Sequence, residues 1–318
     1  MTRTLETTQT QAIKTGILKH LLYSEVFAHP LNQEELIRFS CTKESISFEE
    51  LHAILAELKS DGLVELHDNH ACLFSVDDKI ERRNAAAKRA DGLFDRAIRV
   101  SRFIQKFPFV EGVGISGSLS KGILHDDGDF DFFIIVKPHR VWIARTLLIL
   151  YKKIFLLNSR KYFCVNYFID SDHLEIEEKN RFTAVEVATL IPACGDIFDA
   201  FYEANNWVDD FFPGKGRTAF ETHQIKKPLW SRILQSIFSG AFGNWTDQRA
   251  MKITLNRWKK KFGDFDNEKF ELTMKSRRYV SKHHPNDFQN KVLSKYEELR
   301  SRYTEQHAQG LKKQGIEL

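Results

Sequence analysis

The sequence predicts an α+β protein in which strands gather in the middle of the chain and helices flank them on both sides. Three short apolar runs lie between residues 110 and 170, whereas apolar residues recur at helical spacing over 11–61 and through most of 211–318. The 318 residues, 42% of them hydrophobic and 12% aromatic, suffice for two or three domains. We therefore expect an N-terminal domain over 1–78, a connecting helix over 79–106, a core over 107–212 and a basic helical domain over 213–318.

Residues 11–75 have the pattern of a winged helix. Apolar residues at helical spacing indicate a first helix, and Pro30 closes its exit. Two N-cap pairs predict two further helices: Asn32 with Glu35, and Ser47 with Glu50. Gly62 ends the third helix, and residues 63–75 then alternate as a two-stranded wing would. Three helices and a wing are the usual DNA-binding arrangement.

Charge argues against that use of the predicted winged helix. Between Leu31 and Ser75 the sequence has three basic and nine acidic residues, a difference of minus 6. A recognition helix must lie against phosphates, whose contacts with Lys and Arg drive binding through counterion release. We therefore expect this domain not to bind DNA and to pack against the core or a protein partner instead. The next segment, residues 77–106, is predicted to be a basic helix with a solvated face.

The residues that carry most chemical information lie between 113 and 131. Val113-Gly114-Ile115-Ser116 is predicted to be a strand, and the following Gly117-Ser118-Leu119-Ser120-Lys121-Gly122 a turn that opens a helix, whose unpaired N–H groups can receive phosphate. Asp129-Phe130-Asp131 then begins the apolar run FDFFIIV. Two carboxylates one residue apart on a strand point to the same face, an arrangement typical of divalent metal sites.

This spacing resembles that of the DNA polymerase beta-type nucleotidyltransferase superfamily, over residues 107–212, about a third of the chain. The resemblance implies a mixed-sheet core, a nucleoside triphosphate as substrate and two Mg2+ ions. It places Gly117 and Ser118 against the triphosphate, and Asp129 and Asp131 on the metals. We add Lys121 as a phosphate ligand by its position in the turn. The alternative is an ordinary Gly-Ser turn followed by a solvated strand end.

The third carboxylate of such a site is expected on the strand Tyr162–Asp170, which follows an apolar helix over Val141–Leu157. The polar residue in the middle of that strand is Asn166, whose amide can ligate Mg2+ but cannot accept a proton. Asp170 has the same parity but lies about 13 Å farther along, too far without a bulge.

Two functions remain open for a site with Asn166 at this position. One is transfer of a nucleoside monophosphate to a hydroxyl acceptor, with loss of pyrophosphate. The other is a catalytically degenerate nucleotide-binding protein that regulates a partner through its winged helix. A displaced carboxylate, Glu186, is set aside because Thr183 and Glu186 form an N-cap pair at the start of the next predicted helix.

The remaining segment, Phe211–Leu318, is helical in pattern and has 22 Lys and Arg against 11 Asp and Glu. Either it is attracted to the acidic N-terminal domain, or it faces a phosphate-rich substrate. Within it, Lys282, His283 and His284 precede Pro285 in a predicted polar turn that could bind the acceptor. The sequence does not distinguish a small molecule, a protein or an RNA end as that acceptor.

A cytoplasmic location is expected. The polar start of the chain lacks the apolar core of a signal peptide, and the longest apolar stretch, 141–157, contains three cations and is short for a membrane span. We expect no membrane partner. The four cysteines are far apart in apolar stretches, which predicts buried reduced thiols: Cys41, Cys72, Cys164 and Cys194.

Overall fold

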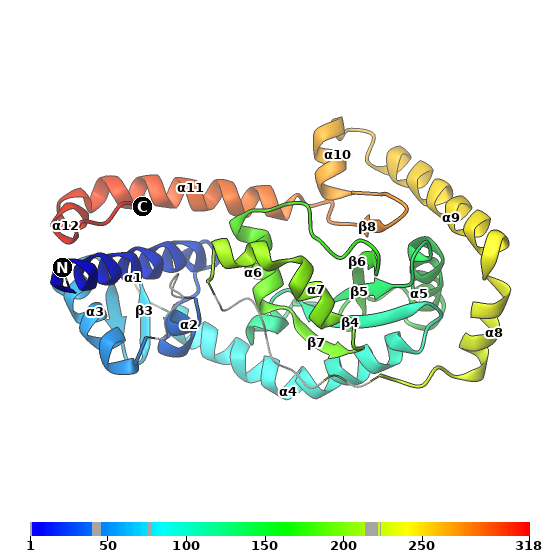
Figure 1. Ribbon diagram of the computed structural model, residues 1–318, viewed down its shortest axis with the longest axis horizontal. Helices are drawn as coiled ribbons and strands as arrows, with labels where there is room; N and C mark the ends of the chain where they lie inside the picture. Colours follow the sequence, from blue (N-terminus) through cyan, green and yellow to red (C-terminus); the bar gives the residue numbers. More distant parts are fainter. Residues whose placement is uncertain (1, 40–45, 75–77, 214–221, 223) are drawn as a thin grey trace.

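The computed structural model describes residues 2–39, 46–74, 78–213, 222 and 224–318, and shows an α+β protein with two sheets (Figure 1). Cys41 and residues 75–77, which include the end of the predicted wing, lie outside the described residues. The three described cysteines are buried and free. Among the described helices none is long and apolar enough to cross a membrane.

The N-terminal helices and hairpin are present as predicted. Helix α1 spans Thr2–Glu25, α2 Gln33–Arg38 and α3 Phe48–Ser60. Both α2 and α3 begin with complete capping boxes, so the two N-cap predictions are confirmed. A small antiparallel sheet has the order β1-β3-β2 and consists of β1 (Leu31–Asn32), β3 (His70–Cys72) and β2 (Glu65–His67).

The long helix α4 (Lys79–Gln105) leads to a five-stranded mixed sheet with the order β7-β4-β5-β6-β8. The central strands match the three predicted runs: β4 (Val110–Ser116), β5 (Asp131–Val136) and β6 (Cys164–Asp170). Strands β5 and β6 are parallel and are connected by α5 (Val141–Phe155), whereas the other neighbouring pairs are antiparallel.

Both edge strands of this sheet escaped the sequence analysis. Strand β7 (Ile191–Cys194) has only four residues, one of them Pro192, which is tolerated at an edge because it lacks a donor. Strand β8 (Val280–Lys282) lies in the segment predicted to be a polar turn. The prediction was wrong for Ser281 and Lys282, which are extended because β8 pairs with Tyr167, Phe168 and Ile169 of β6, whereas Pro285 and Asn286 do form a turn.

Helices fill the rest of the described chain. The ranges are α6 (Arg181–Thr189), α7 (Phe198–Ala204), the 3-10 helix η2 (Asn206–Asp210), α8 (Leu229–Ile237), α9 (Gly240–Lys261), α10 (Asn267–Thr273), α11 (Phe288–Gln306) and α12 (Ala308–Gln314). Within residues 224–318 the described chain is mostly helical, and β8 is the strand in it. These C-terminal helices do not form one bundle: α9 packs on α5, whereas α11 runs alongside α1 (Figure 1).

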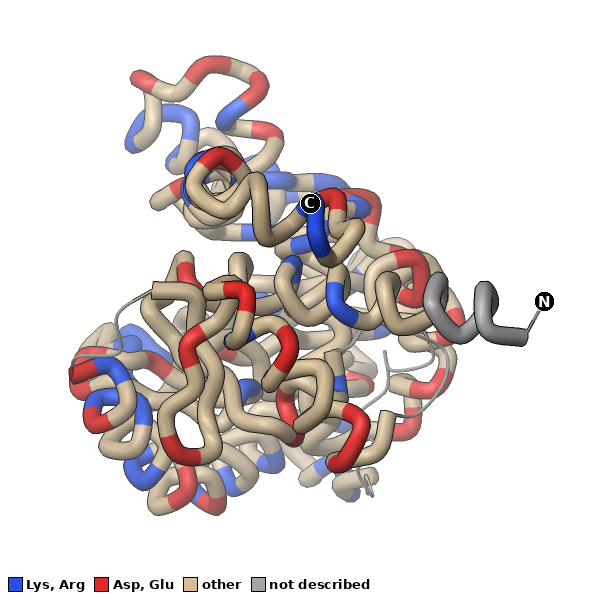
Figure 2. Tube along the Cα trace, turned by 90° about the vertical axis from the view of Figure 1, so that its left-hand side faces the viewer, with Lys and Arg blue, Asp and Glu red and all other residues tan. Residues whose placement is uncertain are grey.

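Opposite charges join the two ends of the chain. Lys313 of α12 is 2.5 Å from the Asp61 carboxylate that follows α3, and Lys14 of α1 donates to the Gln314 side chain at 2.7 Å. The Tyr303 hydroxyl of α11 also donates to the Leu63 carbonyl. Figure 2 looks onto this end of the molecule, where basic and acidic positions of these segments meet. Attraction between the terminal regions, one of the two predicted roles of the basic segment, is thus observed.

The five-stranded sheet has a hydrophobic core on each face, as alternation along its strands requires. Phe132 and Ile134 point to the side covered by α4, α5 and Trp258 of α9. Phe133 and Ile135 point to the other side, where α6 and α7 continue without a break into the apolar residues of α1, α3 and α11. The N-terminal unit therefore shares its core with the sheet and the C-terminal helices.

Candidate functional site

A cavity of about 120 Å³ opens on the sheet face covered by α6. Its sheet side presents Ser116, Asp131 and Asn166, and Glu186 enters from α6. Aromatic side chains close the cavity, and the β8–α11 segment supplies Lys282 and His284; the aromatic residues are Phe133, Tyr167, Phe182, Phe201 and Phe288. Residues predicted separately as catalytic and as acceptor-binding thus line one cavity.

Gly117 lies directly against Asp131. Ser116 and Asp131 are paired across β4 and β5, so the turn that follows Ser116 passes over the carboxylate. Gly117 has a φ of +69°, and a Cβ built on it would lie 2.6 Å from Asp131 Oδ2. Only glycine satisfies both the left-handed backbone and this close approach. The Gly-Ser turn and the acidic strand, ten residues apart in sequence, are therefore in contact.

Burial raises the pKa of Asp131 to about 6. The carboxylates of Asp129 and Glu186 act in the same direction, while a hydrogen bond from the Cys164 thiol and the charge of Lys121 oppose the increase. Asp129 itself precedes β5, which begins at Asp131. The site is therefore a group of carboxylates with a deficit of positive charge, an arrangement that favours a proton or a cation.

Glu186 is the residue whose role the sequence analysis misjudged. Helix α6 is capped by Asn180, whose side chain accepts the Thr183 N–H, so the predicted cap at Thr183 was wrong. Glu186 is consequently released from capping and projects into the cavity. Its Oε1 is 2.8 Å from Lys121 Nζ, which also donates to the Gly117 carbonyl at 2.9 Å. The signal available in the sequence was the alternative cap, Asn180, three residues before Thr183.

The turn after Ser118 is shorter than predicted. A 3-10 helix, η1, covers only Leu119–Lys121, and Gly122 ends it with a φ of +70°. The predicted helix opening at this turn was therefore wrong, and helix-terminal N–H groups are not what this turn offers to phosphate. Lys121 is held by Gly117 and Glu186, and Ser118 is half-buried beside the same turn.

Asn166 lies at a β-bulge in β6. Val165 pairs with Phe132 and Tyr167 with Phe133, so Asn166 is the additional residue between them. Its side-chain NH2 donates to Cys164 Sγ at 2.7 Å, and its main-chain carbonyl accepts the main-chain N–H of His283 at 3.0 Å. Because the NH2 group faces Cys164, the amide oxygen lies on the opposite side of the carboxamide.

Asp170 is not part of this site. It is fully buried at the other end of β6, opposite Val136. Its carboxylate contacts His173 Nδ1 at 2.7 Å and accepts the His139 N–H at 3.2 Å. The bulge at Asn166 does not bring it to Asp131, in agreement with the distance argument from the sequence.

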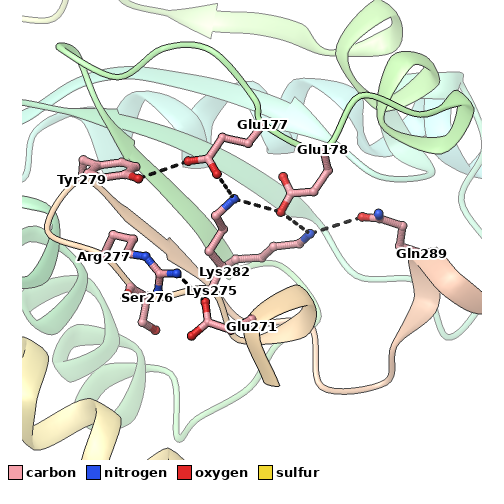
Figure 3. A network of polar contacts seen from close by, with 9 residues as sticks. All are labelled: Glu177, Glu178, Glu271, Lys275, Ser276, Arg277, Tyr279, Lys282 and Gln289. Carbon is pink, nitrogen blue, oxygen red and sulfur yellow. Dashed lines mark hydrogen bonds and ion pairs between the residues drawn. The ribbon is translucent and has the colours of Figure 1, made fainter. Parts of the chain in front are cut away.

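Lys282, at the end of the edge strand β8, and His284, just after it, form the wall of the cavity beside β6. Burial lowers the pKa of Lys282, although Glu178 opposes the decrease. Lys282 Nζ is 3.7 Å from Glu178 and donates to Gln289 at 3.3 Å. Figure 3 shows this contact as part of a network in which Lys275 joins Glu177 and Glu178. The network attaches strand β8 to the loop after β6 and fixes the wall.

The two adjacent histidines have different surroundings. Burial lowers the pKa of His284 to about 4, so its imidazole in the cavity wall is neutral at pH 7. His283 is on the opposite side of the extended segment, with its ring 4.9 Å from that of Trp258. Burial lowers the pKa of His283 to about 3. Of the predicted acceptor residues, Lys282 and His284 therefore reach the cavity and His283 packs away from it.

No three His, Cys, Asp or Glu side chains in the described ranges are placed to hold a metal ion by themselves. Comparison of the chain with protein-family models, curated proteins and solved structures finds no match.

Proposed function

We propose that the protein is a metal-dependent nucleotidyltransferase that moves a nucleoside monophosphate from a nucleoside triphosphate to a hydroxyl acceptor. The observation that carries this proposal is the contact between the Gly117 turn and Asp131, which lines a cavity together with Asn166 and Glu186. The resemblance of the Gly-Ser and Asp-x-Asp segments to the polymerase beta-type superfamily supplies the class of reaction.

The donor set fits Mg2+. Proteins commonly bind Mg2+ through one or two carboxylates and leave the remaining positions to water and substrate phosphates. Asp129 and Asp131 would provide the carboxylates and Asn166 an amide oxygen. The raised pKa of Asp131 shows that its anionic form lacks compensation in this site. When bound, the ion would neutralise phosphate charge in the transition state.

The other residues of the site would position the substrates. Ser118 and the backbone at Gly117 would contact the phosphates. The cavity, at about 120 Å³, is smaller than the 300–1,000 Å³ of typical ligand pockets, so we place the acceptor group there and the triphosphate at its mouth. Lys282 and neutral His284 would hydrogen-bond the acceptor. Glu186 would take the proton of its hydroxyl, the role that the neutral amide of Asn166 does not perform.

The test combines calorimetry with each nucleoside triphosphate and Mg2+ and an assay for pyrophosphate. Replacing Asp129 and Asp131 together by Asn should abolish metal-dependent nucleotide binding without unfolding the protein. Asp127→Asn, in the same loop but exposed, is the matched control and should bind as the wild type does. Equal affinity in the double variant would remove the basis of the proposal.

A second candidate is a nucleotide-binding regulatory protein without catalysis. The hydrogen bond from Asn166 to Cys164 favours it, because it gives Asn166 a structural role. We propose that the N-terminal helices and hairpin form a winged helix in either case. Two of its acidic residues pair with cations of α4: Glu35 with Arg83 at 2.8 Å, and Glu25 with Lys79 at 2.7 Å. These cations are therefore engaged within the protein and do not form a nucleic-acid-binding face. Nucleotide binding without pyrophosphate release would favour this candidate.

A further inference from the structure

Helices α5, α8 and α9 lie at one end of the molecule (Figure 1), and each carries exposed apolar side chains. Helix α8 is amphipathic, but among its nine residues only Ser231 is buried. Six apolar side chains of α8 and the first turns of α9 are 43% to 69% exposed, and we call them the α8–α9 face: Leu229, Trp230, Ile233, Ile237, Phe242 and Trp245. Exposed apolar groups that gather in one region of a monomer mark an interaction surface.

This face is continuous with the exposed end of α5. The Trp230 ring is 5.5 Å from that of Phe107, Phe107 is 5.6 Å from Tyr151, and Tyr151 stacks on Phe155 at 5.1 Å. Leu150, Ile154 and Phe155 are each about half exposed or more at this end of α5. Phe242 also stacks between Phe238 and Trp245. These contacts fix the apolar side chains in place while leaving their outer surfaces uncovered.

The two segments that carry this face, residues 141–161 and 224–262, have almost only positive charges. Over residues 224–262 the one acidic residue is Asp247, which is fully buried, and residues 141–161 contain none. Cations accompany the apolar groups on both segments: Lys153, Arg160, Lys161, Lys226, Arg232, Arg249, Lys252, Arg257 and Lys259–Lys261 are exposed or half-buried there. Arg249 also lies over the Trp245 ring, 5.5 Å from its centroid.

We propose that the α8–α9 face is a peripheral docking site for an anionic lipid surface. Amphipathic helices with aromatic and aliphatic residues on one side and cations beside them lie in the headgroup region of bilayers. Charge argues against a symmetric dimer through this face, because a second copy would bring its own cations against these. Nucleic acid would satisfy the cations but not the aliphatic side chains of Leu229, Ile233 and Ile237. The expectation of no membrane partner rested on the lack of a spanning segment, which peripheral binding does not need.

The test is sedimentation of the full-length protein with vesicles at 0.1 M NaCl. One set contains phosphatidylcholine alone and the other one-third phosphatidylserine. We expect binding to the anionic vesicles, much weaker binding to the neutral ones, and weakening at 0.5 M NaCl because of screening. The double variant Ile233→Gln with Ile237→Gln keeps helix-forming residues in α8. We expect it to bind the anionic vesicles at least about tenfold more weakly than the wild type. Phe48→Gln, on α3 and 52% exposed, is the matched control and should bind normally.

Several results would overturn this proposal. One is that the wild type does not bind anionic vesicles. Another is that the double variant binds them as tightly as the wild type while the two proteins melt at the same temperature. Light scattering that shows a dimer dissociated by the double substitution would assign the face to a second copy. Single-stranded RNA that displaces the vesicles and binds both proteins equally would assign the cations to nucleic acid.

Discussion

Replacing Gly117 by Ala tests the contact on which the candidate site depends. Gly117 and Gly122 border the same turn and have nearly equal backbone angles, with φ of +69° and +70°. A Cβ at Gly122 meets no atom within 4 Å, whereas a Cβ at Gly117 would be 2.6 Å from Asp131 Oδ2 and 3.2 Å from Asp131 Cβ. Gly122→Ala therefore contains the backbone strain alone, and Gly117→Ala contains the strain and the collision.

The expected magnitudes follow from these two contributions. An L-residue in the left-handed region costs about 1 kcal/mol, which applies to both variants. In Gly117→Ala the Asp131 carboxylate must also move and lose its hydrogen bond with the Cys164 thiol, which adds about 1 to 2 kcal/mol. We expect a decrease in melting temperature of roughly 2 °C for Gly122→Ala and roughly 5 °C for Gly117→Ala.

The assay is thermal unfolding of both variants beside the wild type, followed by calorimetry with Mg2+ and a nucleoside triphosphate. Displacement of Asp131 should weaken nucleotide binding at least tenfold in Gly117→Ala and leave it unchanged in Gly122→Ala. Equal melting temperatures for the two variants would refute the contact between the turn and the strand. Unequal melting with equal affinity would keep the contact but refute its part in nucleotide binding.

Three further substitutions test other parts of the structure. Asp247 is fully buried, and its carboxylate accepts hydrogen bonds from the N–H groups of Trp142 and Ile143, both at 2.9 Å. Asp247→Ala should therefore destabilise the protein by about 2 to 4 kcal/mol in thermal unfolding. The control is Asp264→Ala, at an exposed position, which should not change the stability. Because burial raises the pKa of Asp131 from 3.8 to about 6, the folded state binds this proton more tightly than the unfolded state, and stability falls as pH rises from 4 to 6. Asp131→Asn should therefore gain melting temperature relative to the wild type between pH 4 and pH 7, and a constant difference would contradict the burial of the charge. Asn166→Asp should keep metal binding and change the rate of pyrophosphate release more than the affinity; a variant that only melts lower, beside an equally silent wild type, would favour the regulatory candidate.

The position of Glu186 bears on the expectation that strand β6 would carry a third carboxylate. From the sequence, the expected site had two acids and Asn166. This suggested either an enzyme that tolerates the amide or a nucleotide-binding protein without catalysis. In the structure a third carboxylate arrives from α6, near enough to raise the pKa of Asp131 and paired with Lys121. The cavity therefore contains a carboxylate from α6, Glu186, although strand β6 contributes the amide Asn166.

Local features of the chain were predictable because they depend on residues a few positions apart. The capping boxes at Asn32 and Ser47 formed as expected, since each uses a side chain and a backbone N–H three residues away. Where two caps competed, as at Asn180 and Thr183, the sequence analysis chose the wrong one. The apolar runs that became β4, β5 and β6 were likewise recognisable, because each is buried on both faces of the sheet.

The sequence by itself determined the mixed class of the fold, the central strands and the group of Gly117, Asp129 and Asp131, whose short connection keeps them close. Only the tertiary structure decided that β8, from more than a hundred residues later, completes the sheet and brings Lys282 and His284 to the same cavity. It also decided that Glu186 faces Asp131 and that a bulge sets the position of Asn166. These contacts depend on the order of strands and the packing of helices across the sheet, which residue spacing along the chain does not record.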